Sequence, residues 1–189
     1  MPNWCDNSVT ITHSDKSKID AIEAGLSKEQ HEFFQTIRPR PATEEDNWYD
    51  WNITNWGTKW EASIIDWERL GDNEIYVSFD SAWSPPIAVY EFMLEQGYDV
   101  EAMYWESGMA FCGIYEDGFD DYYEYGDLDS DGVTNTIPQE LDEYFCISEQ
   151  LADQEDEQED DEEDQENLDI DLDDGLSATN EGHEEEENE

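Results

Sequence analysis

Basic side chains stop at Arg69 in a chain of 189 residues, and this asymmetry constrains the fold more than any other feature. Residues 1–69 hold all seven Lys and Arg with 13 Asp and Glu, a net charge of 7 − 13 = −6. Residues 70–189 hold the other 54 − 13 = 41 acids with no basic residue. Such a chain resists compaction and repels phosphate backbones and anionic membranes, so an electrostatic partner is expected to be basic or a cation.

The apolar residues indicate where a core can form. All eight Trp lie between Trp4 and Trp105, whereas residues 151–189 hold 21 acids among 39 positions and no aromatic residue. Such a segment buries too little apolar surface to offset the entropy lost on ordering. We therefore expect a folded domain over residues 1–115, a weakly docked, Tyr- and Asp-rich acidic extension with a C-terminal helix over 116–151, and a disordered acidic tail over 152–189.

Alternation, capping and turn signals predict the order β-α-(β)-β-β-α-β-β. The elements are a strand over 4–12, a helix capped by Ser14 or Asp15, a hairpin over 60–68 and 74–80, a helix capped by Ser84 and ending at Gly97, and strands over 98–105 and 109–115. This order predicts an α+β fold with helices on one face of an antiparallel sheet.

Several motifs occur in a fixed order along residues 1–115. They are Met1-Pro2-Asn3-Trp4-Cys5-x-Asn7, Asn55-Trp56-Gly57-Thr58-Lys59-Trp60, Phe79-x-x-Ala82-Trp83-Ser84-Pro85-Pro86, Tyr104-x-Glu106-x-Gly108 and Phe111-x-Gly113. This pattern resembles the YubB-type, ferredoxin-like family of small phage and plasmid proteins. The resemblance implies a ferredoxin-like domain and an origin in a mobile element, and it implies no particular activity.

The motif over residues 55–60 places two Trp, an amide and a lysine close together, a combination suited to a recognition pocket. The alternative is that Trp56 and Trp60 fill a small core, while Gly57 serves a turn with positive φ. Lys59 is expected to pair with an acid or to lie over an indole ring. For Trp83, the alternative is a role at the start of a helix. The residues predicted to bind a partner are Asn55, Trp56, Lys59, Trp60, Trp83 and Glu106.

Two predictions concern the acidic extension. Asp120, Asp121, Glu124 and Asp127 are predicted to belong to a region that imitates nucleic acid. The spacing Asp127-x-Asp129-x-Asp131-Gly132-x-x-Asn135 resembles a calcium loop, in which alternate oxygen ligands converge on one cation. Pro138 occupies the position of the usual bidentate Glu, so calcium is an alternative rather than the main prediction, and no other cofactor is expected.

Catalysis and export both lack a signal in this sequence. None of the three His residues has a ligand-like or triad-like context, so no enzyme activity is predicted. Three Cys without C-x-x-C spacing indicate reduced thiols in or near a core. The first residues do not resemble a secretion signal, and no apolar run reaches the ~18–20 residues that span a bilayer. We expect a protein of the host cell cytoplasm that makes no membrane contact.

The leading hypothesis is a phage-type acidic decoy, a DNA mimic that inhibits a basic host protein of defence or nucleic-acid metabolism. Duplex DNA carries one charge per ~1.7 Å of axis, and dense Asp and Glu runs are among the few protein compositions that approach this density. This hypothesis expects no direct binding of nucleic acid. The alternatives are an aromatic recognition surface with a solubilising tail, and a calcium-binding module.

Overall fold

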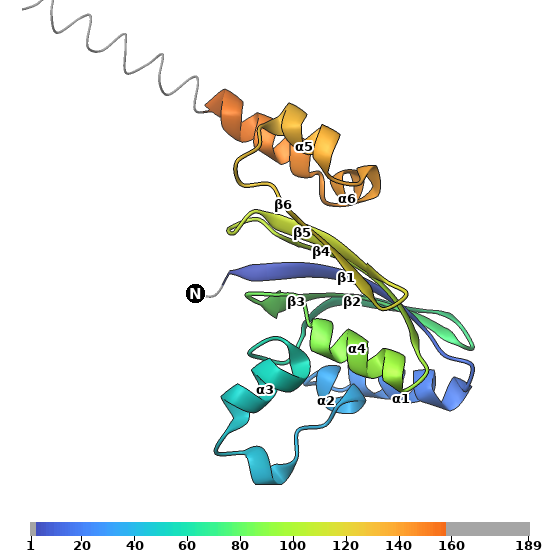
Figure 1. The fold of residues 1–189 in the computed structure, drawn as a ribbon. Helices are drawn as coiled ribbons and strands as arrows, with labels where there is room; N and C mark the ends of the chain where they lie inside the picture. The colour runs from blue at the N-terminus through green and yellow to red at the C-terminus, as the bar shows by residue number, and fades with distance from the viewer. Residues whose placement is uncertain (1–2, 158–189) are drawn as a thin grey trace, which may run out of the picture.

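The structure, a computed structural model, describes residues 3–157 and is a mixed α/β fold built on one open antiparallel sheet (Figure 1). Its elements are β1 (Trp4–Thr12), α1 (Lys16–Leu26), α2 (Phe34–Ile37), a 3-10 turn η1 (Ala42–Glu44), α3 (Trp48–Trp56), β2 (Ser63–Gly71), β3 (Glu74–Ala82), α4 (Ile87–Glu95), β4 (Asp99–Glu106), β5 (Phe111–Glu116), β6 (Phe119–Glu124), α5 (Ser130–Thr136) and α6 (Gln139–Phe145). A further helical segment covers residues 147–157 and so includes the first residues of the tail predicted to be disordered; the rest of that tail, residues 158–189, lies outside the described residues.

The six strands lie in the order β2-β3-β1-β4-β5-β6, with every neighbouring pair antiparallel. In the central strand β1, Val9 lies opposite Val77 of β3 on one side and Ala102 of β4 on the other. Because side chains alternate along a strand, these residues share one face of the sheet. The predicted strands over 4–12, 98–105 and 109–115 and the predicted hairpin are confirmed.

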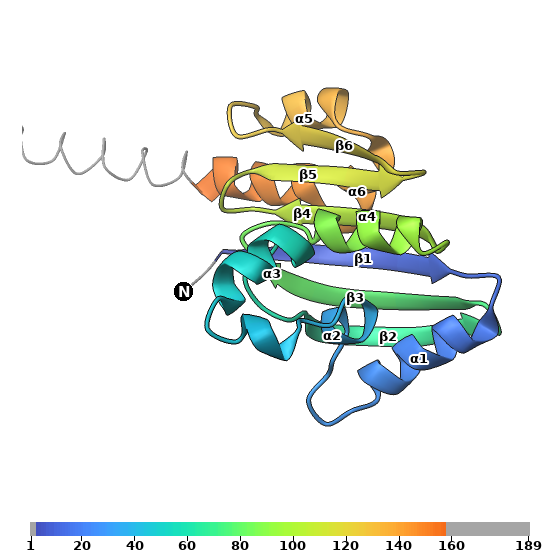
Figure 2. The same cartoon turned by 60° about the horizontal axis from the view of Figure 1, so that its bottom comes forward.

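Helices α1 to α4 cover this face over strands β2, β3, β1 and β4 (Figure 2). Asp15 caps α1, as predicted, by accepting the Ser17 N–H at 2.9 Å. The positive φ of Gly57, 81°, ends α3 in the left-handed conformation that glycine adopts at low cost. The core between helices and sheet consists mainly of Ile, Val, Phe and Tyr side chains: Val9, Ile11, Ile19, Ile22, Leu26, Phe33, Phe34, Ile75, Val77, Phe79, Val89 and Tyr90.

The opposite face of the sheet also carries helices, which corrects the prediction of helices on one face only. Segment 130–157 packs over β4 and β5 and buries Cys112 together with Val133, Leu141 and Ile147. Helix α6 lies within the range of the predicted C-terminal helix, and its Leu141 contributes to this core. The extension therefore packs on the sheet through a second core instead of docking weakly, and the sheet does not stop at residue 115 because β6 pairs with β5.

Three local features of the structure were not predicted. Residues 48–56 form α3, although Trp and Asn have modest helix propensity, because this helix packs its Trp51 and Trp56 against the core. Ser84 does not cap α4; its hydroxyl donates to the Gly57 carbonyl at 2.8 Å, and α4 begins after Pro86. The extension supplies β6, a strand of acids and aromatics.

The three thiols lie in different environments. Cys5 and Cys112 are buried, as predicted, and burial raises the pKa of the Cys112 thiol to about 12. Cys146 is exposed, because its left-handed backbone lies at the break between α6 and the helical segment 147–157. Within residues 3–157, no helix combines the length and the apolar character that crossing a bilayer requires.

Candidate functional site

The motif over residues 55–60 separates into core and surface residues. Trp56 is 3% exposed, and its indole N–H donates to the Arg38 carbonyl at 2.9 Å. The side-chain amide of Asn55 donates to the Trp51 carbonyl at 2.8 Å, one turn earlier in α3. Trp56 therefore fills the core, which is the alternative to a binding role, and its indole N–H is bonded within the protein.

Lys59 and Trp60 are at the surface and contact each other. The Lys59 ammonium lies 4.5 Å from the Trp60 ring centroid and 5.8 Å from that of Tyr49, a cation–π arrangement. Trp4 extends the aromatic surface, with ring centroids 6.1 Å apart between Trp4 and Trp60. The predicted contact with an indole ring is thus present. Glu61 accepts backbone N–H groups at the start of α2 instead of pairing with this lysine.

Glu106 is a structural residue in this fold. Its side chain is nearly inaccessible, at 1% exposure, and its two carboxylate oxygens accept the backbone N–H groups of Gly108 at 2.9 Å and Met109 at 2.7 Å. The carboxylate closes the turn between β4 and β5 and is not free for a partner.

Trp83 lines an open groove of about 370 Å³ beside the start of α4. Its side chain is 51% exposed, and its φ of 73° is unusual for a residue with a bulky side chain. The loop is held in this conformation by Trp83 N–H donating to Asn3 O at 3.0 Å and by Ser81 Oγ donating to Ser84 O at 2.7 Å. The groove is lined by Gly57, Trp83, Ser84, Pro85, Ile87, Tyr104, Phe111, Asp120 and Tyr122.

Asp120 meets Trp83 in this groove, although the two residues were predicted to serve separate sites. The Tyr104 hydroxyl donates to Asp120 Oδ1 at 2.6 Å. Burial, followed by this bond to an acid, raises the pKa of Tyr104, so the phenol stays protonated and remains the donor. Gly113 makes the contact feasible, because a Cβ there would lie 2.2 Å from the Tyr104 oxygen.

Sequence reasoning missed three aromatic residues of the groove. Tyr104, Phe111 and Tyr122 come from the three consecutive strands β4, β5 and β6, and the Phe111 and Tyr122 ring centroids lie 5.3 Å apart. Their common signal is Gly113, because a glycine inside a strand often marks a close approach of other groups. Tyr122 lies directly opposite Gly113 in the register.

The remaining residues of the predicted acidic region lie along and just after the edge strand β6. Asp121, Glu124 and Asp127 are exposed. Asp121 pairs in register with Ile114, which packs in the second core, so it lies on the opposite sheet face from Asp120. On that second face, a cleft of about 200 Å³ between the sheet and α6 is lined in part by Glu101, Glu116 and Glu140.

The residues predicted to bind calcium do not form a loop around one point. Asp129 caps α5, accepting the Gly132 N–H at 2.7 Å, and Asn135 donates to the Asp131 carbonyl at 2.6 Å within that helix. Asp127 precedes the helix. Between residues 3 and 157, no group of three or more His, Cys, Asp or Glu side chains is placed to hold a metal. Calcium binding stays a prediction that would require α5 to unwind.

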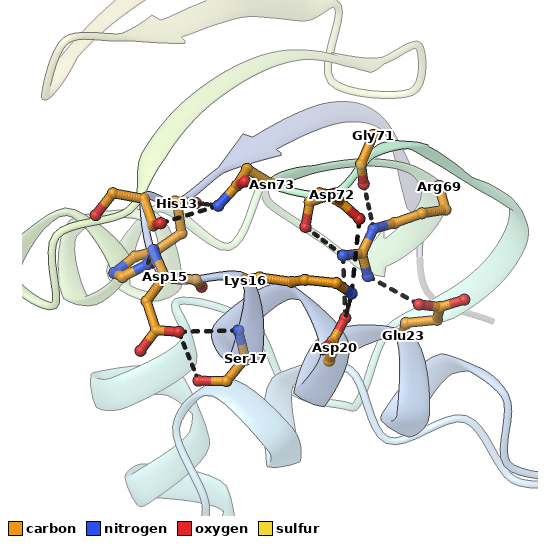
Figure 3. Close-up of polar contacts among 11 residues, drawn as sticks. His13, Asp15, Lys16, Ser17, Asp20, Glu23, Arg69, Gly71, Asp72 and Asn73 are labelled. Atoms are coloured by element: carbon orange, nitrogen blue, oxygen red, sulfur yellow. Dashed lines mark hydrogen bonds and ion pairs between the residues drawn. The ribbon is translucent and has the colours of Figure 1, made fainter.

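Three basic side chains, those of Lys16, Lys28 and Arg69, form ion pairs on the α1 side of the fold. Arg69 reaches from the end of β2 to α1, where it lies 3.0 Å from Asp20 and 2.8 Å from Glu23 (Figure 3). Lys16 lies 2.7 Å from Asp20 and 3.8 Å from Asp72 in the same cluster. All ion pairs of the described chain lie between residues 16 and 72. The acids of β6, α5 and α6 therefore keep their charge unopposed by a cationic side chain.

No family model matches the sequence, and a search of curated proteins finds no match. Among solved structures, the chain is similar to the crystal structure of a protein api92 from Yersinia pseudotuberculosis, described with the family model DUF1281. The identity is 23% and the TM-score 0.37; the match covers 49% of this chain and 39% of api92. A similarity at this level assigns neither a fold family nor a function to the chain.

Proposed function

We propose that the protein is a non-enzymatic, phage-type inhibitor whose acidic surface occupies the nucleic-acid-binding surface of a basic host protein. One observation carries the proposal: the ion pairs of the described chain are confined to residues 16–72, while the strand and helices after residue 115 present carboxylates without a basic neighbour. Unneutralised carboxylates on a folded surface attract a cationic protein and repel nucleic acid.

The arrangement of these carboxylates supports mimicry rather than a solubilising role alone. Asp120 and Asp121 point to opposite faces of β6, and further acids lie on α5 and α6 of the second helix layer, so both faces of the sheet carry negative charge. Same-face neighbours along a strand are ~7 Å apart and adjacent strands ~5 Å apart, so charges on such a scaffold have spacings of the same order as phosphates. Two faces of charge suit a partner that normally surrounds a duplex.

The fold is also compatible with the family resemblance. We infer that β1, α1, β2, β3, α4 and β4 form a ferredoxin-like unit, because their order and the strand arrangement β2-β3-β1-β4 correspond to the split β-α-β motif. Strands β5 and β6 and the second helix layer are then additions to this unit. The proposal therefore includes an origin in a mobile element and a location in the host cytoplasm, where the protein would meet the partner that it inhibits.

The test is capture of a partner from host lysate by the immobilised full chain. Truncation after residue 115 is unsuitable because it would remove β6 and the second core, so tail removal is made after residue 157. The charge-neutralised variant carries Asp121→Asn, Glu124→Gln and Asp127→Asn. Its matched control carries Glu29→Gln, Glu45→Gln and Asp46→Asn, which remove the same charge from exposed positions in the segments between α1 and α3.

We expect the neutralised variant to retain less of a basic protein at every salt concentration than its matched control does. The captured complex should also dissociate steeply as salt rises, because it replaces counterions on both partners. Equal capture by both variants would contradict the proposal. Capture that resists salt and fails with Trp60→Ala or Lys59→Ala would favour the second candidate, recognition by the exposed aromatic surface around Lys59.

A further inference from the structure

The groove between α4 and β6 combines aromatic faces with one carboxylate. Helix α4 lies over β4 and packs Tyr90 against Tyr115 of β5, whereas no helix within residues 3–157 lies in front of the rest of β5 and β6 on this face (Figure 2). Side chains of the two strands are therefore accessible beside the start of α4. Trp83 and Tyr122 are 51% and 48% exposed, whereas Tyr104 and Phe111 are buried beneath them.

The carboxylate is fixed in position by only one of its oxygens. Asp120 Oδ1 accepts the Tyr104 hydroxyl at 2.6 Å, and Tyr104 is itself fully buried in the small core formed with Cys5 and Phe111. In the described part of the chain, no donor is found for Asp120 Oδ2. The acid therefore presents a held, unpartnered oxygen on an otherwise apolar groove.

This combination of groups selects a cation of a particular shape. An aromatic face attracts a cation through its quadrupole, and Trp gives the strongest attraction. A guanidinium also stacks on aromatic rings and donates in a planar fork to a carboxylate, whereas an ammonium is a compact, strongly hydrated charge. No Lys or Arg is among the residues that line the groove, so no basic side chain of the lining competes for the site.

We infer that this groove binds an arginine side chain of the basic partner, with the guanidinium between Trp83 and Tyr122 and directed at Asp120. The inference rests on the proposed function for the identity of the occupant, and it adds a specific contact to an attraction that is otherwise diffuse. The held carboxylate and the fixed, positive-φ conformation of Trp83 provide a preorganised site, which lowers the cost of binding.

The experiment titrates the full chain with Nα-acetyl-arginine N-methylamide, a probe with a single positive charge. The citrulline analogue has nearly the same shape and no charge, and the lysine analogue tests the shape of the cation. The readout is the Trp83 indole N–H resonance in a nitrogen–proton correlation spectrum, assigned with Trp83→Phe. The variants are Asp120→Asn, which keeps an oxygen for the Tyr104 hydroxyl, and Asp121→Asn, which removes the same charge from the other face.

We expect a saturable shift of the Trp83 resonance with the arginine probe, a weaker one with lysine and none with citrulline. Asp120→Asn should weaken arginine binding about three- to tenfold, and Asp121→Asn less than about twofold. Unchanged resonances of the other indoles show that Asp120→Asn preserves the fold. Equal losses in both variants, equal shifts with citrulline, or no shift at Trp83 would overturn the inference. Failure of the proposed function alone would leave the arginine shift intact while no DNA-competitive partner is captured.

Discussion

At the scale of single residues, exposure divides the motif residues by role. Trp56 and Glu106 are buried with every polar atom of their side chains bonded, whereas Trp60, Trp83 and Asp120 reach the surface. The sequence places all five in equally polar, aromatic contexts. Burial is decided by strands and helices that come from other parts of the chain, so residue type alone could not separate the two groups.

Glu106→Gln tests the structural role of that carboxylate. The amide loses one charge-assisted bond to the turn and places a donor next to a backbone N–H, so we expect a loss of about 1–3 kcal/mol in the free energy of unfolding. Urea denaturation measures the loss. Glu101→Gln, an exposed substitution in the same strand, should change the stability by less than about 0.5 kcal/mol. Normal stability with lost partner binding would restore Glu106 as a contact residue.

Asp6 and Asp80 form a carboxyl pair across β1 and β3, on the face away from α1. Partial burial, followed by the effect of the neighbouring Asp80 carboxyl group, raises the pKa of Asp6 from 3.8 to about 6. The folded protein thus holds a proton that the unfolded chain releases, and this pair destabilises the fold as pH rises from about 4 through 6.

We therefore expect Asp6→Asn to raise the melting temperature at pH 8, because its amide can donate to the buried Asp80 oxygen that lacks a partner. The gain in melting temperature should shrink toward pH 5, where a proton on Asp6 can also be donated to that Asp80 oxygen. Thermal denaturation across this pH range measures the difference, with Glu68→Gln as a control for general charge removal on this face of the sheet. A destabilised variant at pH 8 would show that the pair is not strained.

At the scale of elements, the sequence predicted those strands and helices whose patterns are local. β1, the β2–β3 hairpin and α1 have clear alternation, turn or cap signals. β6 lacks such a signal because acids and aromatics are mixed in it, and it becomes a strand by pairing with β5. The aspartates of α5 resemble a calcium loop, since the same residue that would bind a cation also caps a helix.

The second helix layer gives a direct prediction at this scale. Leu141 of α6 is fully buried against the sheet, and the Tyr144 hydroxyl of the same helix lies 2.8 Å from that of Tyr76 on β3. Leu141→Ala should cost about 2–5 kcal/mol of stability, measured by urea denaturation, because it leaves a cavity in the second core. The neighbouring exposed substitution Glu143→Ala should cost little. Equal, small effects would mean that the layer docks only weakly.

At the scale of the whole molecule, charge is segregated in space as well as in sequence. On the α1 side, Lys16, Lys28 and Arg69 form ion pairs with acids, whereas β6 and the second helix layer carry acids and no basic residue. The sequence predicted this segregation because all seven Lys and Arg precede residue 70. It could not predict the groove, because Trp83, Tyr104, Asp120 and Tyr122 are assembled by the strand order.

Competition with duplex DNA tests the central claim most directly. A basic host protein captured on the immobilised full chain is washed at fixed salt with increasing duplex DNA, and the released protein is measured. If the acidic surface stands in for nucleic acid, DNA should release the partner in a saturable manner, because both occupy one basic surface. A partner that binds DNA while remaining attached to this chain would contradict the account.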